Sequence, residues 1–410
     1  MVLELSNLTF TEQDDIVPAS GMELIVNSAI TNTLAGSDVI TGRSEGTSEG
    51  LTYSFRNFGT LNTGEGNDQL TGTLNDPYGF ALTTVAIYNE GAIDTGNGND
   101  IITAIIQEAV MNTSYAIFNI EGTIDTGDGN DTIIGITPKG TGILSWDSNI
   151  NTGDGNDNII GISTAEMGSG ILNLGIIDTG NSNDIITGTG NFVAISNDGI
   201  INTGNGEDFI ISQGKFSNSG VVFLEDGNDS LLVYASLFNV NLSNRALENY
   251  NAIDTGEGDD LITSTGVIYN EGIINTGNGN DSIFVNGGVD GITGNTYGIY
   301  NNGGAINMGD GNDSIIANGG FESAPNSSGA WFLGEGKDYI KGYGSGDFYG
   351  GNGNDTLELT PGTYTVGIWD RVVFAKGNSL MLASEFEQLI AGDQTYDFAN
   401  LTAGQIIVVA

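Results

Sequence analysis

A short motif, G-x-G-x-D, occurs ten times between Gly64 and Asp355 and is the feature of this chain best suited to chemistry. The stretch IDTGNGNDII, residues 93–102, holds one copy. Each copy places a carboxylate beside two glycines, whose backbone can turn tightly and aim carbonyl oxygens inward. Oxygen ligands at this density suit Ca²⁺, which accepts about six to eight carboxylate and carbonyl oxygens. The motif therefore predicts a series of Ca²⁺ sites.

The spacing of the motif indicates what must position it. Successive Asp residues mostly lie 21 to 32 residues apart, and an apolar residue follows two positions after each one. The segments between the motifs are short, β-branched and alternating, with Asn and Gly between them. Each repeat is predicted to form a strand, an Asn-Gly turn, a strand, the Gly-rich turn, a strand and a connection of variable length. The prediction is an all-β, right-handed parallel β-solenoid (β-helix or β-roll), with the Gly-Asp turns stacked on one edge.

Stacking explains why a cation is needed. Equivalent Asp residues of neighbouring coils would lie about 4.8 Å apart. Adjacent carboxylates at that distance repel by roughly 1 kcal/mol in water and by a few kcal/mol at lower effective dielectric. A divalent cation between successive turns would replace this repulsion by attraction. The alternative is that the Asp side chains only cap backbone groups in turns.

Bulk composition excludes several classes of function. The chain of 410 residues has 52 Asp and Glu against 9 Lys and Arg, a net charge of -43. Such a chain is repelled by phosphate backbones, so nucleic acid is not an expected partner. Cys and His are absent, which excludes thiolate or imidazole metal sites and nucleophiles activated by His. No apolar run approaches the ~20 residues of a membrane-spanning helix.

Residues 350–358, GGNGNDTLE, match the nine-residue G-G-x-G-x-D-x-U-x repeat of the RTX (haemolysin-type) calcium-binding family, which this chain resembles. Asp338, Asp347 and Asp355 have the spacing of a contiguous β-roll. The resemblance implies that loop carbonyls and Asp carboxylates of neighbouring turns share several Ca²⁺ ions, about one per coil. The implied Asp ligands are Asp68, Asp100, Asp131, Asp157, Asp184, Asp208, Asp229, Asp260, Asp281, Asp313, Asp338, Asp347 and Asp355. The implied loop glycines are Gly64, Gly66, Gly96, Gly98, Gly127, Gly129, Gly153, Gly155, Gly204, Gly206, Gly256, Gly258, Gly277, Gly279, Gly309, Gly311, Gly334, Gly336, Gly351 and Gly353.

The chain departs from the family pattern in two ways. Thr usually replaces the first Gly, and the period is longer than two nonapeptides, so we expect one ion row rather than two. Ser182 and Glu225 interrupt the glycine positions of two loops, which leaves metal binding at Asp184 and Asp229 open. Asp38, in LAGSD, resembles a degenerate first coil.

The ends of the chain differ from the repeats. Residues 1–32 lack the motif and are predicted to form an N-terminal cap, residues 33–358 the solenoid, and residues 359–410 a C-terminal β cap with antiparallel strands. The last segment resembles the C-terminal part of RTX proteins, which implies type I secretion and an extracellular or cell-surface location. The start shows no cleavable signal peptide, which fits that route.

The expected function is that of a secreted Ca²⁺-binding structural, surface-coat or adhesive protein without catalytic residues. Its expected partners are Ca²⁺ and a cell-surface or matrix polysaccharide or protein. One alternative is a β-helical lyase or hydrolase acting on polysaccharides, and another is an ice-binding or surface-binding solenoid. An Asn column, Asn89, Asn173, Asn197, Asn249 and Asn270, is expected to form a structural ladder at a coil corner. Recurrent Tyr88, Tyr269 and Tyr300 are explained by core or stack packing.

Overall fold

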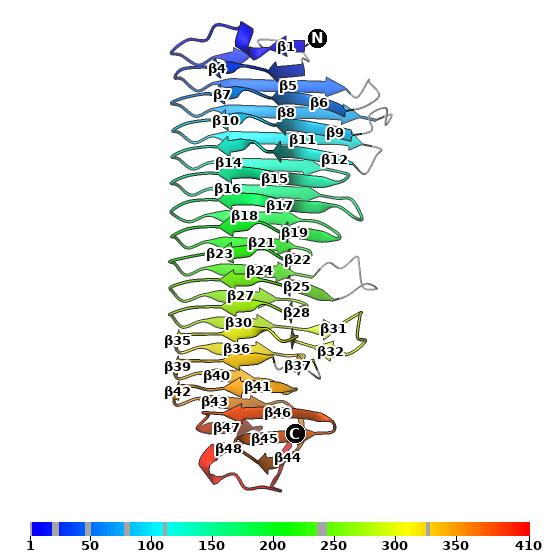
Figure 1. Ribbon diagram of the computed structural model, residues 1–410, viewed down its shortest axis with the longest axis vertical. Helices are drawn as coiled ribbons and strands as arrows, with labels where there is room; N and C mark the ends of the chain where they lie inside the picture. Colours follow the sequence, from blue (N-terminus) through cyan, green and yellow to red (C-terminus); the bar gives the residue numbers. More distant parts are fainter. Residues whose placement is uncertain are drawn as a thin grey trace. The chain divides into compact units, whose positions relative to one another are not determined.

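The protein is a parallel β-solenoid, as predicted from its repeats, and the computed structural model describes residues 2–18, 24–45, 51–77, 83–109, 113–235, 244–324 and 329–410. The chain divides into two compact units, residues 1–221 and 222–410, which we describe separately. Within each unit, coils of three short sides stack so that equivalent strands pair in parallel (Figure 1). The strand β23 (Val221–Phe223) contains the division.

In the first unit the three sides of the coil follow the predicted order. The side before the Asn corner contains β3 (Leu24–Asn27), β6 (Leu51–Asn57), β9 (Thr83–Asn89), β12 (Ser114–Ile120), β15 (Thr141–Asn151), β17 (Ser169–Asp178), β19 (Val193–Asn197) and β22 (Phe216–Asn218). The side after the corner contains β4 (Ile30–Asn32), β7 (Thr60–Asn62), β10 (Ala92–Asp94), β13 (Thr123–Asp125), the ends of β15 and β17, and β20 (Ile200–Asn202). The side after the Gly-rich turn contains β2 (Ile16–Val17), β5 (Val39–Glu45), β8 (Gln69–Asp76), β11 (Ile101–Ala109), β14 (Thr132–Thr137), β16 (Asn158–Ser163), β18 (Ile185–Thr189) and β21 (Phe209–Gln213).

The second unit repeats this arrangement. Before the corner lie β25 (Arg245–Asn249), β28 (Val267–Asn270), β33 (Ile299–Asn301) and β37 (Phe321–Ser323). After it lie β26 (Ala252–Asp254), β29 (Ile273–Asn275), β34 (Ala305–Asn307), β38 (Ala330–Phe332) and β41 (Gly346–Tyr349). After the Gly-rich turn lie β24 (Ser230–Tyr234), β27 (Leu261–Ser264), β30 (Ser282–Val285), β36 (Ser314–Ala317), β40 (Tyr339–Lys341) and β43 (Thr356–Leu359). The turns themselves pair at β35 (Asp310–Gly311), β39 (Glu335–Gly336) and β42 (Asn352–Gly353), and an inserted hairpin holds β31 (Gly288–Val289) and β32 (Thr296–Tyr297).

The interior is a stack of aliphatic residues in register. Ile102 pairs with Ile133, Ile133 with Ile159, and Ile159 with Ile186, and all four are fully buried. Small residues occupy the next inward position, because the opposite side of the coil comes very close there. A Cβ added to Gly161 would lie 2.3 Å from the carbonyl oxygen of Gly170. This close approach makes the coil thin.

The two ends of the chain join the stack in different ways. In the segment predicted as an N-terminal cap, β1 (Val2–Glu4) pairs in parallel with β3 and β3 with β6, beside the 3₁₀ turn η1 (Leu5–Asn7), so regular coils begin before residue 33. At the C-terminus, β44 (Gly362–Ile368), β45 (Val372–Lys376), β46 (Ser379–Ser384) and β49 (Ile406–Val409) pair antiparallel, as expected for this segment. β46 also pairs in parallel with β41, and β47 (Gln388–Ala391) pairs in parallel with β43. The strand β48 (Gln394–Asp397) and the 3₁₀ turn η2 (Phe398–Asn400) follow β47 in the chain. Within the described residues, no helix is long and apolar enough to cross a membrane.

The predicted Asn ladder is confirmed at the corner of the coils. In the first unit the Asn89 amide donates to Oδ1 of Asn119 at 2.7 Å and accepts from Asn57 at 2.7 Å. In the second unit Asn249 donates to Asn270 and Asn270 to Asn301. All these side chains are fully buried. The ladder satisfies polar groups that would otherwise be stranded inside the corner.

Replacing one Asn of the ladder should destabilise the protein strongly. Asn89→Ala removes the shortest of the acceptors of the buried Asn57 amide, which keeps Ala92 and Gly59, and leaves the buried Oδ1 of Asn119 without its donor; each buried group left unsatisfied costs about 1–3 kcal/mol. We expect a loss of roughly 2–4 kcal/mol in the free energy of unfolding, measured by denaturant unfolding in millimolar Ca²⁺. The exposed Asn7→Ala is the control and should change this free energy by less than about 0.5 kcal/mol. Equal effects of the two variants would contradict the ladder's role.

Candidate metal centre

The Asp residues of the G-x-G-x-D motif form one buried column in each unit, which we call the Asp column. Its members are Asp38, Asp68, Asp100, Asp131, Asp157, Asp184 and Asp208 in the first unit and Asp229, Asp260, Asp281, Asp313, Asp338 and Asp355 in the second. The backbone N–H of one Asp donates to Oδ1 of the Asp in the next coil, for example from Asp100 to Asp131 at 2.7 Å and from Asp260 to Asp281 at 2.8 Å. The structure thus brings together the residues that the motif predicted, in register.

The second carboxylate oxygen has no such partner. In eleven members of the column Oδ2 is buried and no hydrogen bond reaches it: Asp38, Asp68, Asp100, Asp131, Asp157, Asp184, Asp260, Asp281, Asp313, Asp338 and Asp355. The hydroxyl of Thr95 is within hydrogen-bonding reach of Asp100, whose pKa it lowers, and of the carbonyl oxygen of Thr126 at 3.3 Å, so its single proton serves one of the two at a time. A buried carboxylate oxygen without a donor is costly, whether the group is ionised or protonated.

A neighbouring column shows that the hydrogen bond alone does not require Asp. One residue before each of Asp100, Asp131 and Asp157 lies an exposed Asn whose Oδ1 accepts a backbone N–H of the next coil. The N–H of Asn130, for instance, donates to Asn99 at 2.7 Å. An amide is therefore sufficient for ladder bonding in the same loop. The Asp column nevertheless has a carboxylate in every coil, so turn capping does not explain its second oxygen.

The glycines of the loop are required by close stacking. Gly98 has φ +145° and Gly129 has φ +150°, which side chains rarely adopt. A Cβ on Gly129 would lie 1.5 Å from the carbonyl oxygen of Gly98 in the preceding coil. The loops therefore lie directly on one another, with backbone oxygens at the interface between coils.

The interrupted loops keep a positive φ at the substituted positions, although the φ of Ser182 is smaller than that of the glycines at its position. Ser182 and Glu225, which stand where other loops have Gly, adopt φ +90° and +69°. The N–H of Asp157 still donates to Asp184, and the N–H of Asp38 donates to Asp68. The degenerate coils at Asp38 and Asp184 therefore supply their carboxylates to the column.

One predicted ligand is wrong. Asp347 lies on β41, in register with Ala330 on the side after the Asn corner, and its Oδ1 accepts a hydrogen bond from Arg371 at 2.7 Å. The nine-residue spacing that suggested a ligand instead places Asp347 on another side of the coil.

The acidic residues between the two loop glycines also lie outside the column. Glu65 and Asp154 are exposed, and the side-chain amides of Asn97 and Asn181 donate to them at 3.1 and 2.6 Å. These exposed carboxylates accept hydrogen bonds from side-chain amides and do not belong to the buried column.

Burial changes the acidity of the column. Desolvation raises the pKa of Asp184 to about 8 and those of Asp131, Asp260 and Asp313 to about 7, with repulsion from neighbouring Asp residues adding to the rise. Backbone hydrogen bonds to the carboxylates oppose this shift in all four. An uncompensated column therefore resists full ionisation near neutral pH, whereas a cation would favour it.

The stability of the metal-free protein should fall as pH rises. Carboxyls whose folded pKa lies above the unfolded value of about 3.9 bind more protons when folded, so the free energy of unfolding decreases between the two pKa values. We expect the thermal midpoint in chelator to be highest near pH 4–5 and to decline until about pH 8, where Asp184 is ionised. Calorimetry across this range checks it, and a midpoint that rises with pH would contradict the burial argument.

The column alone does not complete a metal site. Over the described ranges, no three His, Cys, Asp or Glu side chains lie close enough together to hold an ion. A cation at the column would therefore take one or two carboxylates and complete its shell with loop carbonyl oxygens. That donor set, all oxygen and partly backbone, is the one Ca²⁺ favours.

A hollow in the first unit has few acidic groups among its described lining residues. Its volume is about 250 Å³, and it is lined by Arg43, Ser44, Glu45, Thr73, Asn75 and Gln107. Only one lining residue is a carboxylic acid, whereas glycoside hydrolysis commonly needs a pair.

A surface with few charged residues was missed by the sequence reasoning. The first three outward positions of β8, β11, β14, β16, β18 and β21 form what we call the Thr/Ile face: Gln69, Thr71, Thr73, Ile101, Thr103, Ile105, Thr132, Ile134, Ile136, Asn158, Ile160, Ile162, Ile185, Thr187, Thr189, Phe209, Ile211 and Gln213. None of these residues is charged, and the charged residues begin at the edge of the face, where Arg43 of β5 is in register with Thr73 and Glu108 of β11 is exposed. The period-two alternation of these strands was the available signal.

Aromatic residues gather outward on another side of the first unit. Tyr53, Phe58, Tyr88, Tyr115, Phe118 and Trp146 form what we call the aromatic stripe, on and just after β6, β9, β12 and β15. The ring of Tyr88 lies between two neighbouring rings, with its centroid 6.1 Å from that of Phe58 and 5.6 Å from that of Phe118. These contacts confirm the predicted stack packing of Tyr88. Core packing does not apply, because these rings point away from the interior.

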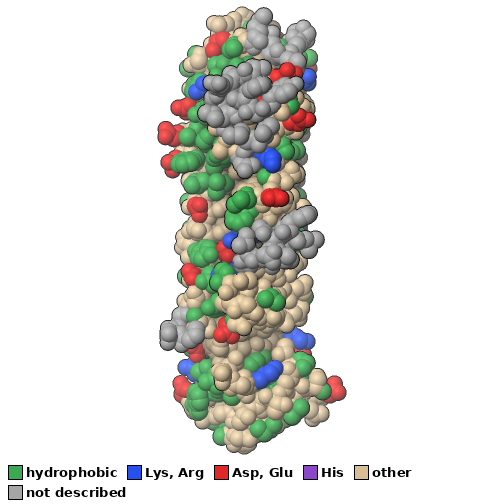
Figure 2. Space-filling view, turned by 90° about the vertical axis from the view of Figure 1, so that its right-hand side faces the viewer, with side chains coloured by type: hydrophobic (Ala, Val, Ile, Leu, Met, Phe, Trp, Pro, Cys, Tyr) green, Lys and Arg blue, Asp and Glu red, His purple; other side chains and the backbone are tan. Residues whose placement is uncertain are grey.

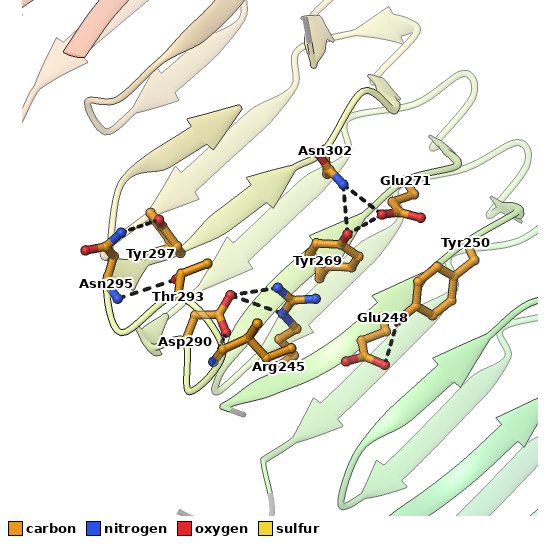
Figure 3. Close-up of polar contacts among 11 residues, drawn as sticks. Arg245, Glu248, Tyr250, Tyr269, Glu271, Asp290, Thr293, Asn295, Tyr297 and Asn302 are labelled. Carbon is orange, nitrogen blue, oxygen red and sulfur yellow. Dashed lines mark hydrogen bonds and ion pairs between the residues drawn. The ribbon is translucent and has the colours of Figure 1, made fainter. Parts of the chain in front are cut away.

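The tyrosines of the second unit pack beneath an inserted hairpin. Arg245 lies 3.6 Å above the ring of Tyr269 and donates two hydrogen bonds to Asp290, which the hairpin carries (Figure 3). Asp290 is fully buried and Tyr269 is 7% exposed. The tyrosine hydroxyls are occupied as well, Tyr250 by Glu248 and Tyr269 by Glu271. Packing thus accounts for Tyr269, as expected.

Comparisons with known proteins do not place the chain in a family. No family model and no curated protein sequence matches it. Among solved structures it is similar to a hyperactive, Ca²⁺-dependent, β-helical antifreeze protein from an Antarctic bacterium, with 20% identity over 81% of this chain and 84% of that one. The TM-score is 0.31, and we draw nothing about this chain's function from so weak a likeness.

Proposed function

We propose that this chain is an extracellular Ca²⁺-binding solenoid with a structural, surface-coat or adhesive role, in which a row of ions lies between successive coils. The observation that carries the proposal is the second oxygen of the Asp column. It is buried without a donor in coil after coil, and the residue is Asp in every coil, although an amide would serve the hydrogen bond. A cation between the coils would bind that oxygen.

The residues present fit such an ion. Oδ2 of the Asp column would bind it, and backbone carbonyls of the stacked Gly loops would complete the shell. A bound Ca²⁺ supplies positive charge that offsets repulsion between carboxylates about 4.8 Å apart. The protein's own groups hold each carboxylate in place, because Oδ1 is fixed by the N–H of the previous coil.

The proposed location follows from the same chemistry. A chain that Ca²⁺ stabilises is least stable where Ca²⁺ is scarce and most stable where it is millimolar, outside the cell. The C-terminal resemblance to RTX proteins supports type I secretion. We expect no catalytic activity, since the Asp residues serve the ion row.

A pair of variants in one loop tests the ion row. Asp131→Asn keeps the acceptor for the Asp100 N–H but removes a column charge, whereas Asp128→Asn removes an exposed charge three residues away. We expect Asp131→Asn to lose one or two bound ions by equilibrium dialysis, and its Ca²⁺ midpoint to rise about tenfold, roughly 1.4 kcal/mol. Asp128→Asn should retain the wild-type ion count. Equal behaviour of the two variants, or no bound Ca²⁺ in the wild type, would refute the proposal.

Ice binding is a second candidate function, and the Thr/Ile face favours it. The residues of the face are uncharged, and their side chains repeat about every 4.8 Å between strands and 6.6 Å along them. Its Thr and Ile residues offer methyl groups and hydroxyls on a rigid grid, which can order water into an ice-like layer. A second copy of the chain fits less well, because the face covers on the order of 500 Å² by strand geometry, below the ~800 Å² per partner of a stable complex.

Thermal hysteresis measurements test this second candidate. Ile134→Lys places a charge at the centre of the Thr/Ile face and should abolish more than nine-tenths of the activity. Ile200→Lys, on the exposed side after the Asn corner, should leave it unchanged. If the wild type shows no hysteresis and is not captured by growing ice, this candidate fails and the ion row is unaffected.

A further inference from the structure

We propose that the aromatic stripe of the first unit binds a neutral, extended polysaccharide of the β-1,4-linked type. The proposal is independent of the ion row, except that the coils must be folded. It rests on the outward position of the rings, their arrangement across successive coils, the polar groups between them and, among the described residues, the excess of carboxylates over the single Arg56 beside the rings.

The rings are not needed to fill the core. At the inward positions of these strands stand Ile87, Ile117 and Ile143, all fully buried. The aromatic side chains point the other way, and Phe58 and Trp146 remain 39% and 48% exposed. Large aromatic surface left in contact with water on several successive coils indicates a binding surface.

The stripe crosses successive coils with a step along the strands at each end. Tyr88 is in register with Phe118, whereas Trp146 is in register with Ile120, two residues after Phe118, and Phe58 lies two residues after Arg56, the register partner of Tyr88. Ring centroids lie 4.9 to 6.1 Å apart from Phe58 to Tyr115, in tilted or edge-to-face contact. Four coils span about 14 Å, enough for a short run of pyranose rings in an extended chain. Interlocked rings lose little side-chain entropy on binding.

Polar groups beside the rings suit sugar hydroxyls. The Tyr88 hydroxyl donates to Glu90 at 3.1 Å, and Arg56 donates to the Tyr53 hydroxyl at 3.2 Å. The guanidinium of Arg56 lies 3.7 Å above the ring of Phe58, and its Nε has no hydrogen-bond acceptor among the described residues. Apolar ring faces next to carboxylate, hydroxyl and guanidinium groups match a pyranose, which has an apolar face and a polar rim.

Charge decides between classes of polysaccharide. Glu90, Glu121 and Asp147 are exposed beside the stripe, and Arg56 is the basic residue that lies among its rings. On the face shown in Figure 2, Lys and Arg side chains occur singly and form no patch. Acidic glycans and nucleic acids would meet repulsion here, so a neutral chain is the occupant that fits.

Cellohexaose binding to the full-length, Ca²⁺-loaded protein tests the proposal. Of three tryptophans, Trp331 is buried and Trp369 is exposed, so a Trp369→Phe background leaves Trp146 as the exposed reporter. We expect a blue shift of its fluorescence that saturates with cellohexaose, and retardation of the protein in gels containing hydroxyethyl cellulose. Phe58→Ala should weaken binding about tenfold, whereas Ile176→Ala, an exposed apolar residue elsewhere in the same unit, should change it less than twofold.

The outcomes separate clearly. Circular dichroism in Ca²⁺ must first show that each variant keeps the wild-type spectrum, so that loss of binding is not loss of fold. No response to cellohexaose together with no retention on cellulose, chitin or hydroxyethyl cellulose would overturn the proposal. Retention on polygalacturonate rather than neutral glycans, or equal losses in Phe58→Ala and Ile176→Ala, would overturn it too.

Discussion

In excess chelator, the thermal unfolding midpoint of this protein should fall by roughly 20 °C or more relative to millimolar Ca²⁺. Each ion bound at a hundred times its dissociation constant contributes about 2.7 kcal/mol. Even four or five ions in the Asp column would then supply about 10 kcal/mol, and each kcal/mol shifts the midpoint of a unit this size by about 2–4 °C. Circular dichroism with a Ca²⁺ titration after chelation measures the effect and its midpoint.

Magnesium is the appropriate comparison for this experiment. Mg²⁺ carries the same charge but demands near-octahedral geometry at short distances and keeps its waters. It should restore little of the lost stability, whereas simple charge screening by any divalent cation would make the two ions equivalent. Unchanged melting curves in chelator and Ca²⁺ would mean that the buried carboxylates are satisfied in another way.

Gly129→Ala should be the most damaging single substitution among those considered for the loops. The added Cβ would lie 1.5 Å from the carbonyl oxygen of Gly98, and φ is +150°. Neither the loop nor its neighbour can move, because both are held by hydrogen bonds to coils on either side. We expect the free energy of unfolding to fall by at least about 4 kcal/mol, as is found for strained or overpacked sites. The measurement is the unfolding midpoint, or the yield of soluble protein where the variant does not fold.

The control for this variant separates backbone strain from stacking. Gly377 also has positive φ, +63°, but an added Cβ would meet open space. Gly377→Ala should therefore cost only about 1 kcal/mol. If both variants have the same modest effect, the loops are less tightly stacked than the structure indicates.

The Thr/Ile face and the aromatic stripe of the first unit are suited to different partners. The Thr/Ile face lies over Gly161 and its equivalents, where the opposite side of the coil approaches closely. The aromatic stripe lies on a different side and is uneven, with tilted rings and polar groups between them. Variants that affect ice activity and glycan binding should therefore be independent, because the two sides share no outward residues.

The repeat alone determined much of this protein. The period of the G-x-G-x-D motif, its apolar partner residue and the Asn positions were enough to predict a parallel solenoid, its three-sided coil, the Asn ladder and the column containing Asp68 through Asp355. Such predictions succeed because each repeat is one structural unit, and stacking carries every residue type into a row.

The tertiary structure was needed to show on which side of the coil a residue lies and which groups its side chain contacts. Asp347 has the spacing of a ligand, yet it points to Arg371 because its strand lies on a different side of the coil. Ser182 and Glu225 looked like interruptions, but neighbouring coils hold them at positive φ, so Asp184 stays in the column.

The state of the second Asp oxygen and the existence of the Thr/Ile face also required the structure. Hydrogen-bond satisfaction depends on which donors lie within about 3 Å, and sequence spacing does not specify this. The Thr/Ile face combines residues from six strands of different coils, so its lack of charge shows only after register is known. Sequence spacing thus determined the rows, whereas packing decided which atoms of each row remain available to an ion or a surface.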